Sequence, residues 1–406
     1  MIYRSCIFLT FLVLTCCGTP TQKRGLTEIP TPTGPGSHLP YLTSDSTGNI
    51  FLSWVEPLAD SENHALHFSK LNERKFLKPT SIAQSGKWFV NWADYPTIIS
   101  NGGDVIAAHV LNKTPGNTYS YNVNMYLRDG ADAWSGPVVP HADSTATEHG
   151  FASMIPWNED VLAIWLDGRR TANRSEKEYF NIDKAMTLRS AVISRDGTVN
   201  HPKKIDQTVC DCCNTALAQT SNGAVAAYRN RTDDEIRDIY VSRYVNNEWT
   251  APVPVHNDNW KIAACPVNGP AIAASDSLVT VAWYTAANGK RMIKATSSSD
   301  YGTTFSDPKI ISDESPLGRV DLAMDLSGKA YISWMEKSNT ETTLRVKTVD
   351  RMGNISEAQT ITNLNASRKS GFPQMELSGG TLVFAWTSVG DTFSVQTATM
   401  PLDDID

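Results

Sequence analysis

Several ionisable side chains stand in short polar segments that come just before apolar, strand-like runs. Asp94 and Asp321 occur in such segments, and His149 follows directly after Glu148. Carboxyl groups and an imidazole that meet around a polar ligand such as a sugar can act as general acid and base. We therefore predict Asp94, His149 and Asp321 as candidate catalytic residues.

Other polar and aromatic side chains in the same kind of segment could hold a ligand without reacting with it. They are His38, Trp92, Asn214, Asn268 and Arg319. A single histidine in a loop is more often simply solvated or hydrogen-bonded, so ligand binding and catalysis both stay open at this point.

Four cysteines form a second group, which consists of Cys210, Cys212, Cys213 and Cys265. In an oxidising compartment, four cysteines can pair in three ways. Cys212 and Cys213 are adjacent and would point to opposite sides of an extended segment. We predict a disulfide to Cys265 and a second one inside residues 210–213. The rival is a soft-metal site built with His149, but the C-x-C-C spacing differs from common zinc motifs. We expect neither metal nor cofactor.

A recurring large side chain at the end of short apolar runs indicates the elements that position these groups. It recurs at intervals of roughly 50 to 60 residues, the length expected of a repeat architecture. The seven positions are Trp54, His109, Trp165, Tyr228, Trp283, Trp334 and Trp386. Around each one we recognise a lead-in strand, this apolar strand, an alternating strand and an edge strand that begins near a proline.

Four strands in each of seven copies predict an all-β fold, a single seven-bladed β-propeller of four-stranded antiparallel blades. The last copy ends after three strands. Residues 26–30 read as a short strand without a blade of its own, so we expect this N-terminal strand to close the last blade. The predicted propeller covers residues 36–401, and residues 17–35 form a tether together with the closing strand.

The first residues have the pattern of an export signal. Arg4 precedes an apolar stretch that is shorter than the roughly twenty residues needed to span a bilayer. Residues 14–18, Leu-Thr-Cys-Cys-Gly, resemble a bacterial lipobox, which implies a signal peptide over residues 1–16 and lipidation of Cys17. Cleavage before Cys16 and an ordinary secretory signal remain alternatives. The expected location is the cell envelope, through a lipid anchor.

One turn carries a family resemblance. Ser298, Asp300, Gly302 and Phe305 match the Asp box, S-x-D-x-G-x-x-[WF], and the chain resembles the sialidase-like propellers with BNR repeats over residues 36–401. The resemblance implies the fold, whereas Asp boxes occur in enzymes and binding proteins alike. Seven repeats exceed the six blades of sialidases, and residues 36–41 lack the first arginine of the sialidase triad. We therefore do not transfer the catalytic set.

In a propeller, the segments that enter the innermost strands surround one end of the channel, where we expect the candidate residues above. We expect the loops after the second strands, at 167–170 and 229–231, at the opposite end. The charged run at 229–238 could clamp an anion. On this geometry we favour a surface turn whose charges neutralise one another.

The charge composition of the chain argues against a nucleic-acid partner. The formal charge is −7 with 19% charged residues, and the chain lacks the basic stripe of a nucleic-acid binder. We predict a monomeric, sialidase-like propeller that binds a carbohydrate or similar polar ligand at the mouth, with hydrolysis left open. The alternatives are a non-catalytic protein-binding scaffold and a periplasmic metal or thiol-redox protein.

Overall fold

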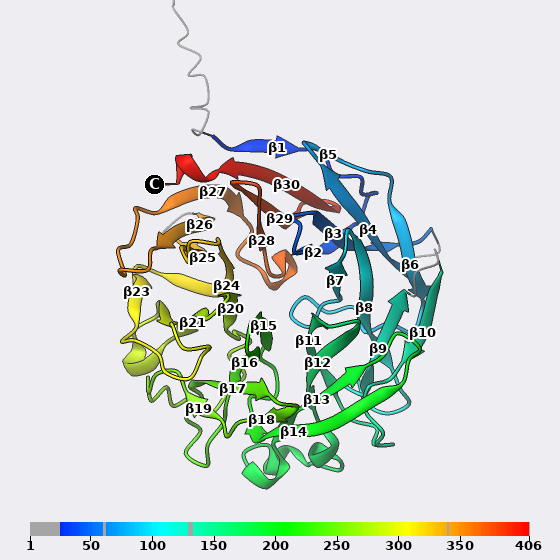
Figure 1. The fold of residues 1–406 in the computed structure, drawn as a ribbon. Coiled ribbons are helices and arrows are strands. Elements are labelled where there is room, and N and C mark those ends of the chain that lie inside the picture. The colour runs from blue at the N-terminus through cyan, green and yellow to red at the C-terminus, as the bar shows by residue number, and fades with distance from the viewer. Residues whose placement is uncertain (1–24, 60–61, 129–132, 339–340, 406) are drawn as a thin grey trace, which may run out of the picture.

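Seven small β-sheets stand around a central channel (Figure 1). The computed structural model describes residues 25–405 except 60–61, 129–132 and 339–340. The predicted signal peptide and Cys17 lie outside the described residues. Neighbouring strands pair antiparallel, and in six of the seven sheets they follow one another in chain order. The predicted seven-bladed propeller of four-stranded antiparallel blades is confirmed.

The strands occupy equivalent places in the seven blades. The innermost strands are β2 (His38–Ser44), β7 (Thr97–Asn101), β11 (His149–Trp157), β15 (Ala216–Thr220), β20 (Ala271–Ser275), β24 (Pro316–Met324) and β28 (Gln374–Ser378). The second strands are β3 (Ile50–Pro57), β8 (Asp104–Lys113), β12 (Asp160–Asp167), β16 (Gly223–Arg229), β21 (Leu278–Thr285), β25 (Ala330–Lys337) and β29 (Thr381–Val389). The third strands are β4 (His64–Asn72), β9 (Tyr121–Arg128), β13 (Met186–Ile193), β17 (Ile239–Val245), β22 (Met292–Ser298), β26 (Thr342–Val349) and β30 (Phe393–Pro401). The outer edges are β5 (Lys75–Phe76) with β6 (Thr80–Ser85), β10 (Trp134–Val138), β14 (Val199–Val209), β18 (Glu248–Trp249) with β19 (Val253–Pro254), β23 (Lys309–Ser312), β27 (Gln359–Leu364) and β1 (Thr27–Ile29).

The seventh blade contains strands from both ends of the described chain. β1 pairs antiparallel with β30, with Thr27 opposite Thr399 and Ile29 opposite Thr397. Figure 1 shows β1, in blue, along the outer side of the red β30. Ile29 is buried and packs in the same apolar cluster as Trp54 of blade 1.

The recurring large side chains fill the spaces between neighbouring blades. All seven are buried, with Trp54, Trp165, Trp283 and Trp334 at most 2% exposed. Trp165 shares an apolar cluster with Leu111 of the preceding blade 2. Trp54 of blade 1 packs with residues of blade 7 in the same way, so the contact runs around the whole ring. Burial of a large apolar side chain contributes about 1.5–3 kcal/mol, so the recurring side chains help to hold neighbouring blades together.

The buried indole N–H groups donate to carboxylates. Trp54 and Trp165 donate to the acidic residue two positions further along, Glu56 and Asp167, both at 3.1 Å. Trp334 donates in the same manner to Glu336. This spacing works because residues two apart on a strand point to the same face, and it satisfies a donor that would otherwise be buried without a partner.

The Ser298–Phe305 turn follows the local physics that its sequence predicts. The Asp300 carboxylate accepts from the backbone N–H of Thr304 at 2.9 Å, and the Gly302 N–H donates to the Ser298 hydroxyl at 2.9 Å. Gly302 has a φ of 78°, which an L side chain adopts only with strain. Phe305 packs against the apolar cluster shared by blades 4 and 5.

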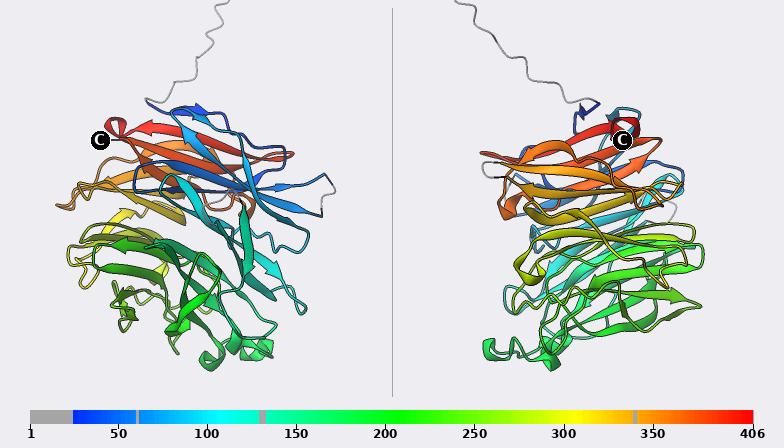
Figure 2. Two further views of the ribbon diagram at one scale, coloured as in Figure 1. Left: turned by 45° about the vertical axis from the view of Figure 1, so that its right-hand side comes forward. Right: turned by 90° about the vertical axis from the view of Figure 1, so that its left-hand side faces the viewer.

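Short 3₁₀ helices are the only helices among the described residues. They are η1 (Arg169–Thr171), η2 (Glu176–Glu178), η3 (Ile182–Lys184), η4 (Ala287–Gly289), η5 (Arg368–Ser370) and η6 (Leu402–Asp404). The first three form one insertion between β12 and β13, and in the side view of Figure 2 these green turns extend beyond the strands. In the described part of the chain, no helix is long and apolar enough to cross a membrane.

The contacts of Glu336 predict a large stability effect. Besides the Trp334 indole, its carboxylate accepts from the Ser312 hydroxyl at 2.8 Å and the Ser315 N–H at 2.7 Å. Glu336→Ala leaves these buried donors unpaired, so we expect the free energy of unfolding to fall by about 3 kcal/mol or more. Urea denaturation measures this, with the exposed Glu341→Ala as control. Equal losses in both variants would contradict the role of the contact.

Candidate active site

The loops after the second strands lie at the same end of the ring as the segments that enter the innermost strands. In blade 3, His149 at the start of β11 pairs with Asp167 at the end of β12. In blade 4, the Cys210 N–H donates to the Arg229 carbonyl at 2.9 Å. The expectation of opposite ends is therefore wrong. Two antiparallel strands form a hairpin, which returns the chain to the level at which it entered.

A cavity of about 700 Å³ lies at this end. Its walls come from the segments that enter blades 2, 3, 4, 5 and 7, from the loop before β9, and from the insertion between β12 and β13. These wall segments lie within residues 89–94, 116–121, 146–151, 171–186, 211–212 and 265–267, with Arg368 in addition. Because both kinds of loop meet here, the cavity can combine side chains from several blades, as ligand sites in proteins commonly do.

Asp94, Tyr121 and Glu148 form a short chain of hydrogen bonds in the cavity wall. The Tyr121 hydroxyl lies 3.1 Å from Asp94 Oδ2 and 2.6 Å from Glu148 Oε1. A phenol carries a single hydrogen. Both contacts can be hydrogen bonds only if one of the two carboxyl groups is protonated and donates to the phenol oxygen. The geometry therefore indicates one proton shared by the two carboxyl groups.

The electrostatics of the pair agree with this reading. Burial raises the pKa of Asp94 to about 7, against hydrogen bonds from the Phe151 N–H and Tyr121. Burial also raises the pKa of Glu148 to about 8, and repulsion by Asp94 adds to it. Near neutral pH, the two carboxyl groups thus hold one proton between them, and the Tyr121 hydroxyl connects them.

Close packing holds this chain in place. The Phe89 ring stacks on Tyr121 with centroids 4.5 Å apart, and the Phe151 N–H donates to Asp94 Oδ1 at 2.8 Å. Gly150 passes so near that a Cβ there would collide with Asp94 Oδ2 and approach the Tyr121 ring. A glycine at 150 is thus required by the close approach of these side chains.

The insertion between β12 and β13 contributes a cation and an aromatic ring to the cavity. Arg174 donates to Asp211 Oδ2 at 2.7 Å and to the Lys184 carbonyl at 3.0 Å, and its guanidinium lies 4.9 Å from the Tyr179 ring centroid. The sequence prediction missed Tyr121, Arg174 and Tyr179. All three follow second strands, and placing those loops correctly would have drawn attention to them.

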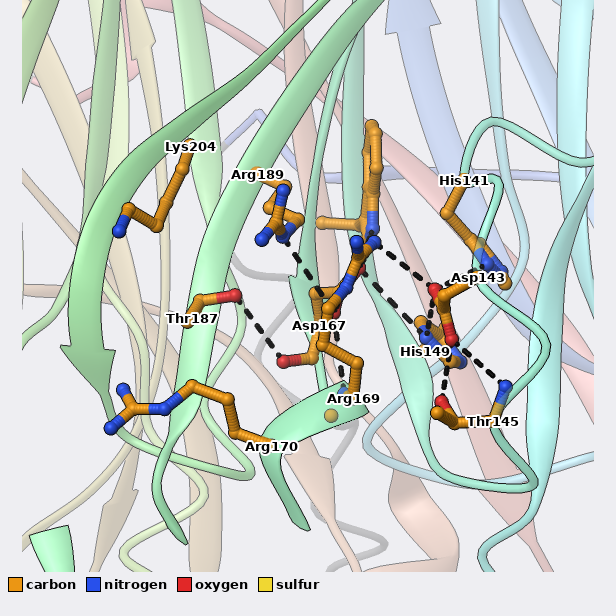
Figure 3. A network of polar contacts seen from close by, with 12 residues as sticks. His141, Asp143, Thr145, His149, Asp167, Arg169, Arg170, Thr187, Arg189 and Lys204 are labelled. Atoms are coloured by element: carbon orange, nitrogen blue, oxygen red, sulfur yellow. Dashed lines mark hydrogen bonds and ion pairs between the residues drawn. The ribbon is translucent and has the colours of Figure 1, made fainter. Parts of the chain in front are cut away.

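His149 lies away from the cavity. Its Nε2 is 3.1 Å from Asp143 Oδ2, and its ring stacks on His141 at 3.8 Å (Figure 3). Arg169 lies between Asp143 and Asp167, 3.0 Å from the first and 2.6 Å from the second. This network ties the segment before β11 to the end of β12. The structure therefore separates His149 from Asp94, with which it was predicted to act.

Asp321 is also outside this cavity. It lines the central channel, where its carboxylate accepts from the Met375 N–H at 2.6 Å and the Leu322 N–H at 2.9 Å. Burial raises the pKa of Asp321 to about 6. Asp94 lines both the channel and the cavity. Of the three predicted catalytic residues, Asp94 alone stands in the cavity wall.

The predicted ligand-binding residues divide in a similar way. Trp92 lines the cavity, whereas Asn214 lines the channel and donates to the Ala93 carbonyl at 2.9 Å. Asn268 accepts from the Arg319 N–H at 2.8 Å and lines neither space. His38 is likewise in neither, and its Nδ1 is 3.0 Å from the Gly36 carbonyl.

Arg319 supports Trp92 from behind. Its guanidinium donates to the Gly371 carbonyl at 2.7 Å and the Ser367 carbonyl at 3.1 Å, and it lies 5.2 Å from the Trp92 ring centroid. Burial lowers the pKa of Arg319 to about 10. With its donors used in this way, Arg319 orients the wall of the cavity and does not reach into it.

The arginines of the run at 229–238 are buried, which corrects the favoured surface turn, while Asp233 and Asp234 at its tip are exposed. Arg229, Arg231 and Arg237 are at most 2% exposed. Glu235 accepts from Arg231 at 2.6 Å and from Arg237 at 2.7 Å, so one carboxylate neutralises two guanidinium groups. The charges do satisfy one another, but inside the protein, because the loop folds over the mouth end of blade 4 and backbone carbonyls complete its hydrogen bonds.

The cysteines pair as predicted. Cys212 bonds to Cys265 with Cα atoms 6.1 Å apart and connects the segments that enter blades 4 and 5. Cys210 bonds to Cys213 inside the local segment. Cys212 and Cys265 both line the cavity, so the first bridge forms part of its wall.

Among the described residues, two groups have ligand atoms close enough together for a metal ion. One consists of Cys210, Cys212 and Cys213, whose sulfurs are engaged in disulfides. The other consists of His141, Asp143 and His149. Here the Arg169 guanidinium already lies 3.0 Å from the shared Asp143 oxygen, so a positive charge occupies the place that a cation would take.

No protein-family model matches the sequence, and no curated protein sequence matches it. Similar folds occur in a puromycin-hydrolysing peptidase from Mycobacterium tuberculosis (11% identity, 90% of this chain and 52% of that chain, TM-score 0.48) and in a polysaccharide lyase (8% identity, 90% of both chains, TM-score 0.51). A third is the NanB sialidase from Streptococcus pneumoniae (11% identity, 91% of this chain and 69% of that chain, TM-score 0.46). The chain spans about half the length of the peptidase.

These likenesses concern the fold alone. By its fold the chain is a seven-bladed β-propeller.

Proposed function

We propose that the protein is a carbohydrate-active enzyme that hydrolyses a glycosidic bond in the cavity. The observation that carries this proposal is the Asp94–Tyr121–Glu148 chain, in which two carboxyl groups share a proton near neutral pH. Glycoside hydrolysis needs one carboxyl group that donates a proton and a second that is charged. A cavity of about 700 Å³ has the size of a site for one or a few sugar units.

Each member of the chain has a distinct role in this proposal. Glu148 donates its proton to the departing glycosidic oxygen as the bond to the sugar breaks. Water attacks the anomeric carbon, and its proton passes to the Tyr121 oxygen while the Tyr121 hydrogen passes to Asp94. Return of that proton from Asp94 through Tyr121 to Glu148 restores the starting state.

Further cavity residues suit a carbohydrate. The Trp92 ring offers an apolar surface for a sugar face, and the exposed Arg368, 5.7 Å from that ring centroid, offers hydrogen-bond donors. The carbohydrate class is also supported by the polysaccharide lyase that shares the fold. A protein-binding scaffold does not require buried carboxyl groups that share a proton. Metal or thiol chemistry requires free sulfurs, and these sulfurs are bonded to one another.

We also propose that the protein is exported and anchored by a lipid on Cys17. The support is the lipobox-like sequence at 14–18 and the Thr-, Pro- and Gly-rich stretch that follows it. Such a tether would present the propeller at a membrane surface in the cell envelope.

Removal of the proton donor should abolish turnover. We expect Glu148→Gln and Asp94→Asn to lower kcat by about 10²- to 10⁴-fold on a panel of fluorogenic glycosides and polysaccharides. Glu376→Gln is the matched control, because Glu376 is a carboxyl group in the central channel whose pKa burial raises to about 7. The proposal fails if Glu148→Gln keeps the activity of the parent, or if no sugar is turned over.

The same carboxyl groups predict an unusual pH dependence of stability. Burial raises the pKa of Glu148 above its usual range to about 8, so the folded protein binds this proton more tightly than the unfolded chain. The associated stability is present below pH 4 and is lost as pH rises through 8. We expect Glu148→Gln to be more stable than the parent at pH 9 and to lose that advantage at pH 5. Urea denaturation at both values measures the difference, and parallel pH profiles would refute the assignment.

Lipidation has a direct test. Expressed with its signal in a bacterium, the protein should partition into the detergent phase of Triton X-114, and its N-terminal peptide should carry a diacylglyceryl group in mass spectrometry. Cys17→Ala should move the protein to the aqueous phase. An unmodified N-terminus in the parent would show that the signal is an ordinary secretory one.

A further inference from the structure

A row of aromatic rings leads from the reacting groups to the protein surface. Phe89 stacks on Tyr121 at 4.5 Å with an interplanar angle of 15°, and Tyr119 meets Phe89 edge-on at 6.1 Å. Tyr121 is buried, Phe89 is half-buried and Tyr119 is 59% exposed. Tyr119 belongs to the cavity rim, on the loop that precedes β9.

A second aromatic pair stands on the insertion between β12 and β13. Tyr179 lines the cavity, and its ring meets the Phe180 ring edge-on at 5.1 Å. Guanidinium groups of Arg174 and Arg231 lie 4.9 Å and 5.6 Å from the Tyr179 centroid and hold that ring. Phe180, in contrast, is 54% exposed.

The position of the two exposed rings sets them apart. In the described ranges, Tyr119 and Phe180 are the only aromatic side chains more than half exposed to solvent. Tyr119 lines the cavity that contains the proton-sharing carboxyl groups and contacts the wall residue Phe89, whereas Phe180 contacts the wall residue Tyr179. Single exposed apolar residues are common on proteins. Two exposed aromatic rings near one cavity, each in contact with a second ring, are in contrast suited to stack on the flat face of a ligand.

We propose that Tyr119 and Phe180 are binding subsites for sugar units of a glycan chain beyond the unit held at Asp94 and Glu148. This inference is based on the proposed carbohydrate function and specifies its substrate class, which is an oligosaccharide or polysaccharide. The flat C–H faces of pyranose rings pack on aromatic faces, and a rigid ring costs little conformational entropy when it is covered. A chain that follows the rim covers both rings.

Affinity electrophoresis tests this surface with the full chain. Native gels contain, one at a time, xylan, arabinan, galactan, polygalacturonate or chondroitin sulfate. We expect at least one polymer to retard the parent protein, and each of Tyr119→Ala and Phe180→Ala to weaken the apparent affinity by roughly two- to tenfold, with a larger loss in the double variant. Tyr119→Phe keeps the ring and should bind like the parent. Leu326→Ala changes a side chain that is 96% exposed and outside the cavity, and should have no effect.

Two further arms distinguish failure of the subsites from failure of the proposed reaction. The double alanine variant should still cleave whichever fluorogenic monosaccharide glycoside the parent cleaves, whereas Glu148→Gln should be retarded normally in the gel without cleaving it. Equal retardation of the double variant and the parent would overturn the subsites, as would cleavage of short glycosides with no retardation by any polymer. Retardation that depends on both rings, together with full activity of Glu148→Gln, would leave the subsites standing and overturn the acid role.

Discussion

The packing of one large side chain against the preceding blade is the contact on which the rest of the structure depends. A four-stranded blade has no core of its own, so its second strand must bury a large side chain in the space beside its neighbour. Trp54 makes this contact with blade 7, and the ring therefore has no open end. The carboxylates of Glu56, Asp167 and Glu336 satisfy the indole donors that this burial would otherwise leave unpaired.

A ring held in this way can tolerate an unfavourable site. Asp94 and Glu148 are carboxyl groups removed from water, and burial raises the pKa of both. The packing between the blades offsets the free energy that the burial of these two groups costs. Phe89 and the close approach of Gly150 prevent their side chains from moving into water. Carboxyl groups whose burial costs free energy are typical of functional sites. A solvent-exposed carboxyl group would not keep its proton near neutral pH. The stacked rings that begin at Phe89 continue this rigid wall outward to Tyr119.

Repetition made the fold predictable, and its absence made the site hard to predict. The recurring Trp, His109 and Tyr228 mark seven positions at similar spacing, so errors at single strands do not change the blade count. The two disulfides were predicted in outline from the spacing of the cysteines, whereas the structure decided that Cys212 is the residue that bonds to Cys265. Tyr121 and Arg174 have no counterpart in other blades, and their loops were placed at the wrong end of the ring. His149 was predicted beside Asp94, yet an unforeseen partner, Asp143, holds it in a separate network.

The sequence by itself determined the architecture, the blade count and the presence of one disulfide to Cys265 and one inside residues 210–213. These depend on short-range patterns, namely alternation along a strand and a spacing that repeats. Only the tertiary structure decided which side chains meet. It brought Asp94, Tyr121 and Glu148 together, from three separate segments, around one proton. That outcome depends on contact distances of 2.6 and 3.1 Å and on the burial of the carboxyl groups. No local pattern in the chain encodes either of them.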